Sequence, residues 1–315
     1  MKVRVLNILP VVGVCILISA YIMVQSPPRL LVATTTSLYD TGLLDLIGEA
    51  YFENTWHRVG FIAVGTGLAL EHAKRGDVDA VFVHAPTLEG EILQENACGL
   101  RKIIAYNYFV IVGPANDPAH IAGLSPTQAM RRIAETGSLW VSRADNSGTN
   151  NKEIALWEGA GYEYENLRSK DWFFETGTGM GSTLLVANEK GAYTLSDTGT
   201  FLKYKKENLI TLEKLVSESE ELLNVYSVMV VNPEKHPSVK FELAAEFVEF
   251  LISPGVQQLI AEFGKEEFGE VLFYPAVEIL ENENSAVAQW IKETAFIDNS
   301  ECPPHLRFGR ADLYE

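Results

Sequence analysis

The chain has 315 residues, room for about two domains of roughly 150 residues each, with 25 Lys and Arg against 42 Asp and Glu and a formal net charge of −17. Hydrophobic residues make up 47%, which is typical of a globular protein and excludes a mainly disordered, collagen-like or disulfide-scaffold chain. The acidic balance argues against a nucleic-acid groove or a broad cationic membrane patch. It leaves room for a site that binds one small anion, because salt screens distant surface charges.

Residues 1–28 are expected to direct export. Lys2 and Arg4 precede an apolar run from Ile8 to Val24 that carries no charge, which is the layout of a signal peptide. With the positive residues kept in the cytoplasm, everything after this segment is outside the membrane. The run is long enough to be either a cleaved signal or a retained membrane anchor, and both alternatives stay open.

Apolar periodicity then predicts alternating strands and helices. The expected order is strand 30–34, helix 41–54, strand 61–64, helix 68–75, strand 80–83, strand 107–114, helix 126–135, strand 139–142, helix 149–160, helix 180–189, strand 192–195, strand 225–231, helix 239–251 and helix 255–263. This βαβ rhythm predicts an α/β protein with a parallel sheet covered by helices.

Two apolar runs, 108–112 and 226–230, are expected to be paired segments that cross between two lobes. Residues 29–112 plus 225–276 then form lobe 1, and residues 113–224 form lobe 2. No role is assigned to the C-terminal extension, 277–315. In open α/β sheets ligands bind beyond the carboxyl ends of strands, so the informative residues are expected at strand-to-helix turns.

The first such turn is Thr34-Thr35-Thr36-Ser37, four hydroxyls at a predicted helix start. Helix N-termini favour anions; the alternative is a loop with one hydroxyl acting as N-cap. The second turn, Val64-Gly65-Thr66-Gly67, lets a ligand approach the backbone or is a simple glycine turn.

The strongest pattern is Ser142-Arg143-Ala144-Asp145-Asn146-Ser147-Gly148-Thr149. It offers a guanidinium, hydroxyls and backbone N–H groups to one tetrahedral oxyanion, and Asp145 is placed to brace Arg143. A surface Arg beside a capped helix is the alternative. The glycine-rich turn 177–183 is expected to line the same cleft, with Ser182 or Thr183 as an extra donor.

The sequence contains no Gly-x-Ser-x-Gly, P-loop, His-Glu-x-x-His or Cys/His metal pattern. We therefore expect no catalytic residue, cofactor or metal cation, although an enzyme on the same two-lobed fold stays an alternative. Outside the leader only Cys98 and Cys302 remain. They predict either a disulfide that pins the C-terminal tail or two free buried thiols.

Several motifs occur in the order found in one known family: 34–44 (TTTSLYDTGLL), 64–67 (VGTG), 76–84 (GDVDAVFVH), 112–114 (VGP), 142–149 (SRADNSGT), 179–184 (GMGSTL), 192–197 (AYTLSD) and 231–233 (VNP). Over roughly residues 30–275 the chain resembles the tungstate-binding proteins of ABC importers. The resemblance implies a periplasmic-binding-protein type II fold, two α/β lobes joined by a two-strand hinge. It also implies capture of tungstate or molybdate in the cleft and delivery to an ABC permease with its ATPase.

The family's oxyanion site carries over to Thr34–Ser37 and Arg143 and, by position, to Ser147 and Thr149. With donors from the neighbouring turns, the expected ligand-binding set is Thr35, Thr36, Ser37, Thr66, Arg143, Ser147, Gly148, Thr149 and Ser182. Another oxyanion, phosphate or sulfate, is the alternative ligand.

Two positions depart from related patterns. Ala144 stands where the family usually has Gly, which puts in question a backbone contact there. His84 stands where similar phosphate-binding proteins have an Asp that accepts a hydrogen bond from protonated phosphate. Without that carboxylate we expect the site to favour tungstate or molybdate over hydrogen phosphate. His84 itself is expected to be an ordinary hydrogen-bonded histidine near the sheet edge, not a ligand.

Overall fold

A computed structural model describes residues 27–282 and 284–314. The predicted export segment therefore lies outside the described residues, apart from its last two positions, 27 and 28. Within the described ranges no helix has the length and apolar character needed to cross a membrane.

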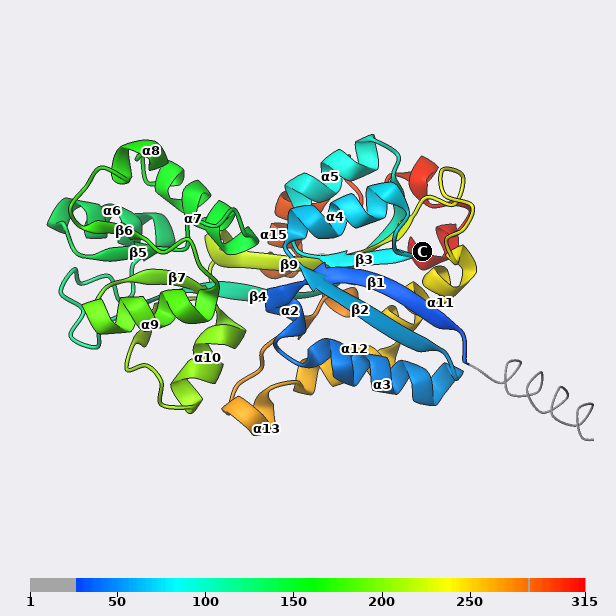
Figure 1. Ribbon diagram of the computed structural model, residues 1–315, viewed down its shortest axis with the longest axis horizontal. Coiled ribbons are helices and arrows are strands. Elements are labelled where there is room, and N and C mark those ends of the chain that lie inside the picture. The colour runs from blue at the N-terminus through cyan, green and yellow to red at the C-terminus, as the bar shows by residue number, and fades with distance from the viewer. Residues whose placement is uncertain (1–26, 283, 315) are drawn as a thin grey trace, which may run out of the picture.

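Two α/β lobes are joined by two long neighbouring strands, β4 (Cys98–Gly113) and β9 (Leu223–Val231) (Figure 1). The two strands are antiparallel partners. Residues 109–113 of β4 continue into the second lobe, where they pair with β7 (Thr194–Asp197) and β8 (Glu213–Val216). The predicted fold, two lobes with a two-strand hinge, is confirmed. The predicted limits of the lobes fall inside β4 and β9 and stay a prediction.

Lobe 1 contains a sheet in the order β10-β4-β9-β3-β1-β2. The strands not yet defined are β1 (Arg29–Thr35), β2 (Arg58–Val64), β3 (Ala80–Val83) and β10 (Tyr274–Pro275). β1 runs parallel to β2 and β3, as the βαβ rhythm predicts, but β9 is antiparallel to both of its neighbours. The parallel part of the sheet is thus β2-β1-β3, and the crossing strands that adjoin it are antiparallel. A chain that leaves the lobe through β4 returns through β9, so these crossing strands must run in opposite directions.

Helices cover both faces of this sheet. α4 (Thr66–Arg75) and α5 (Pro86–Gln94) lie on one side, and α3 (Leu43–Thr55) and α12 (Pro254–Glu262) lie on the other (Figure 1). The short helix α2 (Thr36–Tyr39) follows β1 directly, and α11 (Phe241–Ile252) and α13 (Lys265–Phe268) complete the lobe.

Lobe 2 has a smaller framework of β5 (Trp140–Ser142), β6 (Phe173–Glu175), β7 and β8. Its helices are α6 (Pro126–Thr136), α7 (Gly148–Gly159), α8 (Tyr164–Leu167), α9 (Met180–Lys190) and α10 (Thr198–Lys206). The indole rings of Trp140 and Trp157 are fully buried and pack edge to face, with ring centroids 5.2 Å apart. Such aromatic packing gives this small lobe a core of its own.

The C-terminal extension packs on lobe 1 through α14 (Val277–Glu281), α15 (Ala286–Ala295) and two 3₁₀ turns, Pro304–Leu306 and Ala311–Tyr314. Of the two alternatives for Cys98 and Cys302, the structure has the free, buried thiols, and both lie in one apolar cluster. The tail is held instead by hydrogen bonds to Arg101, whose guanidinium donates to the carbonyl of Glu301 at 2.9 Å and whose carbonyl accepts from the Tyr314 hydroxyl at 2.8 Å.

Candidate functional site

A cavity of about 520 Å³ opens between the lobes. Thr36, Ser37 and Asp40 line it from lobe 1, and Arg143, Ser182 and Lys203 line it from lobe 2. Its wall is therefore built in part from the strand-to-helix turns that the sequence singled out, together with one additional cation, Lys203, and two carboxylates, Asp40 and Glu267.

Two of the four hydroxyls of the first turn make hydrogen bonds within the fold, and the other two line the cavity. Thr34 donates to the carbonyl of Phe82 at 2.8 Å, and Thr35 caps α2 by accepting from the N–H of Leu38 at 3.2 Å. Thr36 and Ser37, the first two residues of α2, line the cavity. Thr35 therefore acts as the N-cap of α2. The next two hydroxyls, of Thr36 and Ser37, are the ones that face the cavity and are available to a ligand.

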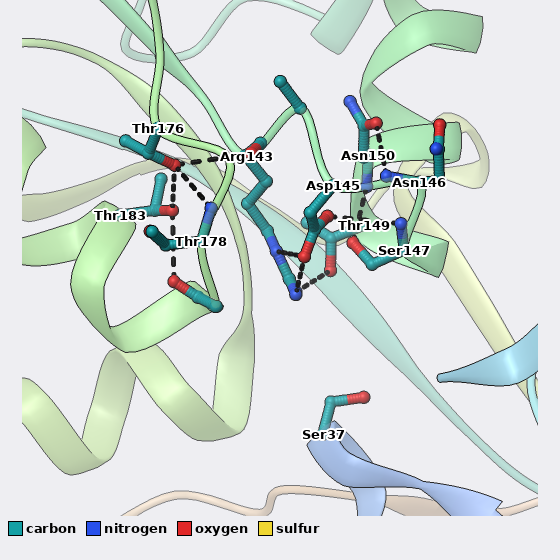
Figure 2. Close-up of polar contacts among 12 residues, drawn as sticks. Ser37, Arg143, Asp145, Asn146, Ser147, Thr149, Asn150, Thr176, Thr178 and Thr183 are labelled. Atoms are coloured by element: carbon teal, nitrogen blue, oxygen red, sulfur yellow. Dashed lines mark hydrogen bonds and ion pairs between the residues drawn. The ribbon is translucent and has the colours of Figure 1, made fainter. Parts of the chain in front are cut away.

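Arg143 follows β5 and is held in place by its own loop. Its Nε donates to Asp145 Oδ2 at 3.1 Å, its Nη2 pairs with the same oxygen, and its Nη1 lies 3.4 Å from Thr149 Oγ1. Figure 2 shows the guanidinium between these partners, with Ser37 of the opposite lobe across the gap. The expected brace by Asp145 is present. Arg143 is 9% exposed, so its charge meets little competing water.

The loop uses several of its own backbone donors. The N–H groups of Ala144, Asn146 and Ser147 donate to Ser142 Oγ, Asn150 Oδ1 and Asp145 Oδ1, respectively. Ala144 has φ +46°, a left-handed conformation that suits Gly better. The N–H groups that the fold leaves to a ligand are those of Gly148 and Thr149, because the first turn of α7 has no earlier carbonyl to pair them.

Beneath the loop, Glu153 of α7 joins two residues of β5. It accepts from Trp140 Nε1 at 2.8 Å and from Ser142 Oγ at 2.9 Å. Burial is the main cause that raises the pKa of Glu153 from 4.5 to about 7. The carboxyl fixes the position of Ser142, the residue before Arg143, and so helps to orient the backbone that carries the guanidinium.

The glycine-rich turn lines the cavity as expected, through Gly179, Met180, Gly181 and Ser182. Gly181 packs closely on Tyr204, because an added Cβ would lie 1.9 Å from its hydroxyl and would force that side chain to move. Thr183 instead faces Thr176, with 2.9 Å between their hydroxyl oxygens (Figure 2).

The nine predicted residues therefore fall into three groups. Thr36, Ser37, Arg143 and Ser182 line the cavity, and Thr35, Ser147, Gly148 and Thr149 belong to the turns that carry them. Thr66 is buried at the start of α4 and is not among the residues that line this cavity, so its role in binding stays a prediction.

Sequence reasoning underrated His84. It follows β3, an inner strand of the sheet, and is 8% exposed. Its Nε2 lies 3.4 Å from Ser37 Oγ, and its Nδ1 lies 2.9 Å from Asn224 Oδ1 on β9. Burial lowers the pKa of this imidazole. The signal that could have found it was its place at a strand end beside two other cleft turns.

Comparison with known proteins agrees with this geometry. A model described as a PBP superfamily domain matches residues 24–254. The tungstate-binding protein TupA of Peptoclostridium acidaminophilum is 38% identical over 254 residues, covering 80% of this chain and 87% of that protein. The tungstate-binding protein TupA of Desulfovibrio alaskensis has a solved structure with 40% identity and a TM-score of 0.73, covering 79% and 98% of the two chains. A structure titled as the tungstate ABC transporter from Geobacter sulfurreducens has 40% identity and a TM-score of 0.68, covering 75% and 98%.

Proposed function

The chain belongs to the periplasmic-binding-protein superfamily and, within it, to the family of the tungstate-binding TupA proteins. On that premise we propose that it is an extracytoplasmic receptor that captures tungstate, or the similar molybdate, between its lobes. The permease and ATPase of an ABC importer are its partners in this proposal. Residues 1–28 supply the export signal or anchor.

The observation that carries the proposal is the buried, braced guanidinium of Arg143 at the cavity wall. A guanidinium with five N–H donors suits a tetrahedral oxyanion, and charge-assisted hydrogen bonds are the strong ones. Asp145 and Thr149 fix the guanidinium of Arg143 before a ligand binds, so little side-chain entropy is lost on binding. Thr36, Ser37 and Ser182 are the proposed hydroxyl donors, with the first N–H groups of α7.

The selectivity we propose follows from what faces the anion. At pH 7 tungstate carries no proton, whereas phosphate does. At the end of β3 the chain has His84 and no carboxylate, so the proton of hydrogen phosphate finds no acceptor at that strand end; the carboxylates of Asp40 and Glu267 lie elsewhere on the cavity wall. Fully deprotonated dianions should therefore be preferred, and the width of the closed cleft should separate the larger tungstate and molybdate from sulfate.

Calorimetric titration of the purified protein with tungstate, molybdate, sulfate and phosphate tests this function. We expect tight binding of tungstate or molybdate and weak binding of the other two. In the same titration Arg143→Ala should lose about 100-fold or more in affinity, or ~3 kcal/mol, because a charge-assisted bond contributes about 1.5–3 kcal/mol.

Arg131→Ala is the matched control, since Arg131 lies on the surface of the same lobe and donates only to the carbonyl of Ala160. Its affinity should equal that of the wild type. Tight binding of phosphate alone would overturn the choice of ligand. Normal affinity in Arg143→Ala would overturn the site.

A further inference from the structure

His84 is the point where the hinge, lobe 1 and lobe 2 meet. Its ring packs on Tyr226 of β9, with ring centroids 4.8 Å apart, and its Nε2 faces Ser37 of lobe 1. On the other side it faces Gly148, the first residue of α7 in lobe 2. A Cβ added to Gly148 would lie 3.2 Å from Cε1 of His84, closer than side-chain carbons usually approach.

A chain of hydrogen bonds fixes the ring from the hinge. Asn107 of β4 and Asn224 of β9 are direct cross-strand partners. Asn107 Nδ2 donates to the carbonyl of Leu272 at 3.3 Å, which leaves its Oδ1 to accept from Asn224 Nδ2 at 2.9 Å. Asn224 Oδ1 therefore faces His84, so Nδ1 of His84 must carry the hydrogen.

This assignment decides what the other ring nitrogen does. In the neutral imidazole Nε2 has a lone pair and, before an anion binds, accepts from the hydroxyl of Ser37. A Ser hydroxyl has a single hydrogen, so a bound anion takes this hydrogen in place of His84. Tyr226 packs on the ring. Burial has the largest effect on the pKa of His84 and lowers it, which favours the neutral form; the charge of Arg143 acts in the same direction and the charges of Glu89 and Asp197 act against it. One edge of the imidazole thus contacts the hydroxyl of Ser37 in the cavity. Another edge faces Gly148, in the loop 142–149 of lobe 2.

We propose that His84 is a positioning residue that sets how closely lobe 2 approaches lobe 1 and thereby selects the size of the bound oxyanion. The inference rests on the proposed receptor function. In this proposal Asn107 and Asn224 fix the position of the imidazole. Contact between Gly148 and the imidazole then limits how far lobe 2 can close, and this limit sets the distance between Ser37 and Arg143. Glycine at 148 allows the closest approach, because an added Cβ would press on the ring and one of the two would have to shift.

A double-mutant cycle tests this contact. Gly148→Ala keeps the N–H but adds the Cβ. His84→Asn keeps a donor near the place of Nδ1 but removes the ring edge that faces Gly148 and Ser37. We expect Gly148→Ala alone to weaken tungstate binding by about tenfold, as overpacking typically does. In the His84→Asn background the same change should cost less than about twofold.

The second measurement is the ratio of tungstate to sulfate affinity. If His84 sets the cleft width, this ratio should fall in His84→Asn, because the shorter side chain lets the lobes close further around the smaller anion. A purely structural role would weaken all oxyanions by one factor. Equal losses from Gly148→Ala in both backgrounds, or an unchanged ratio, would overturn the proposal. Should His84→Asn not fold, His84→Ser gives the same comparison.

Failure of the receptor function would look different. A wild-type protein that binds no tungstate contradicts the ligand assignment, and the coupling between positions 84 and 148 is then measured with whichever of the four oxyanions it binds. If it binds none, urea unfolding of the four ligand-free proteins reports the coupling, and additive effects on the unfolding midpoint would overturn the contact.

Discussion

At the scale of single residues, two positions of the loop 142–149, Ala144 and Asn146, have a left-handed backbone, and Ala144 is the one whose side chain suits it less well. Ala144 has φ +46° directly beside the guanidinium, and its N–H is used by Ser142. A left-handed conformation costs an L-residue about 1–2 kcal/mol. The loop accepts this strain because the bend at 144 lets Arg143 and Asp145 pair from positions only two residues apart.

Ala144→Gly should therefore raise the free energy of unfolding by about 1 kcal/mol, because Gly adopts this conformation without strain although it gains entropy in the unfolded chain. Urea unfolding measures the change. The same substitution at Ala134, inside α6, is the matched control and should lower stability by about 0.5–1 kcal/mol. Two changes of the same sign would show that Ala144 is not strained in solution.

The sequence indicated the residue types of the site better than their partners. The pairing of Arg143 with Asp145 could be predicted from their spacing alone. The hydroxyl-bearing turns could be predicted from their position directly after strands. The partners of His84 could not be predicted, because Ser37 and Asn224 are 47 and 140 residues away and meet it only through the sheet order. Thr66 shares the glycine-turn pattern, is buried at the start of α4, and stays a predicted ligand residue.

At the scale of elements, most of the longer helices and strands were predictable from apolar periodicity, with ends shifted by a few residues, whereas α10, α15, β6 and β8 were not predicted. The first nine residues of β4 were not, because Arg101 and Lys102 interrupt the apolar run. Both charges are buried against carboxylates, Arg101 with Glu89 and Lys102 with Glu301, a tertiary compensation that local periodicity does not contain. The helix α5 was missed because its buried face includes Glu89 itself.

The packing of α7 on β5 makes stability depend on pH. The pKa of Glu153 is raised from 4.5 to about 7, chiefly by burial, so the folded chain holds this proton more tightly than the unfolded chain. The resulting stabilisation is complete below pH 4.5 and is lost as the pH rises through 7. A shift of this size corresponds to at most about 3 kcal/mol.

Glu153→Gln cannot titrate, so the difference in unfolding free energy between wild type and variant should shrink by up to about 3 kcal/mol from pH 5 to pH 8. Urea unfolding at a series of pH values measures it. Glu158→Gln, at an exposed position of the same helix, serves as control and should show no such trend. A constant difference for Glu153→Gln would mean that the buried carboxyl is ionised throughout.

At the scale of the whole molecule, one buried ion pair connects the tail, the sheet and the site. Arg101 and Glu89 are both fully buried, with Nη2 and Oε2 2.7 Å apart. Glu89 also accepts from the N–H of Ala85 at 2.7 Å and from Ser227 Oγ at 2.6 Å, so it fixes the residue after His84. The tail closes over this pair through the carbonyl of Glu301.

Arg101→Met should lower the free energy of unfolding by about 3–5 kcal/mol, because it leaves a buried carboxylate without its partner. The double variant Glu89→Gln/Arg101→Met should recover part of the loss, since no charge is then buried. Urea unfolding measures both, and limited proteolysis should release the tail in Arg101→Met first. Arg168→Met is the matched control, because Arg168 pairs with Glu165 on the surface and should contribute about 1 kcal/mol or less. An Arg101→Met variant as stable as that control would show that the apolar contacts of the tail hold it without the ion pair.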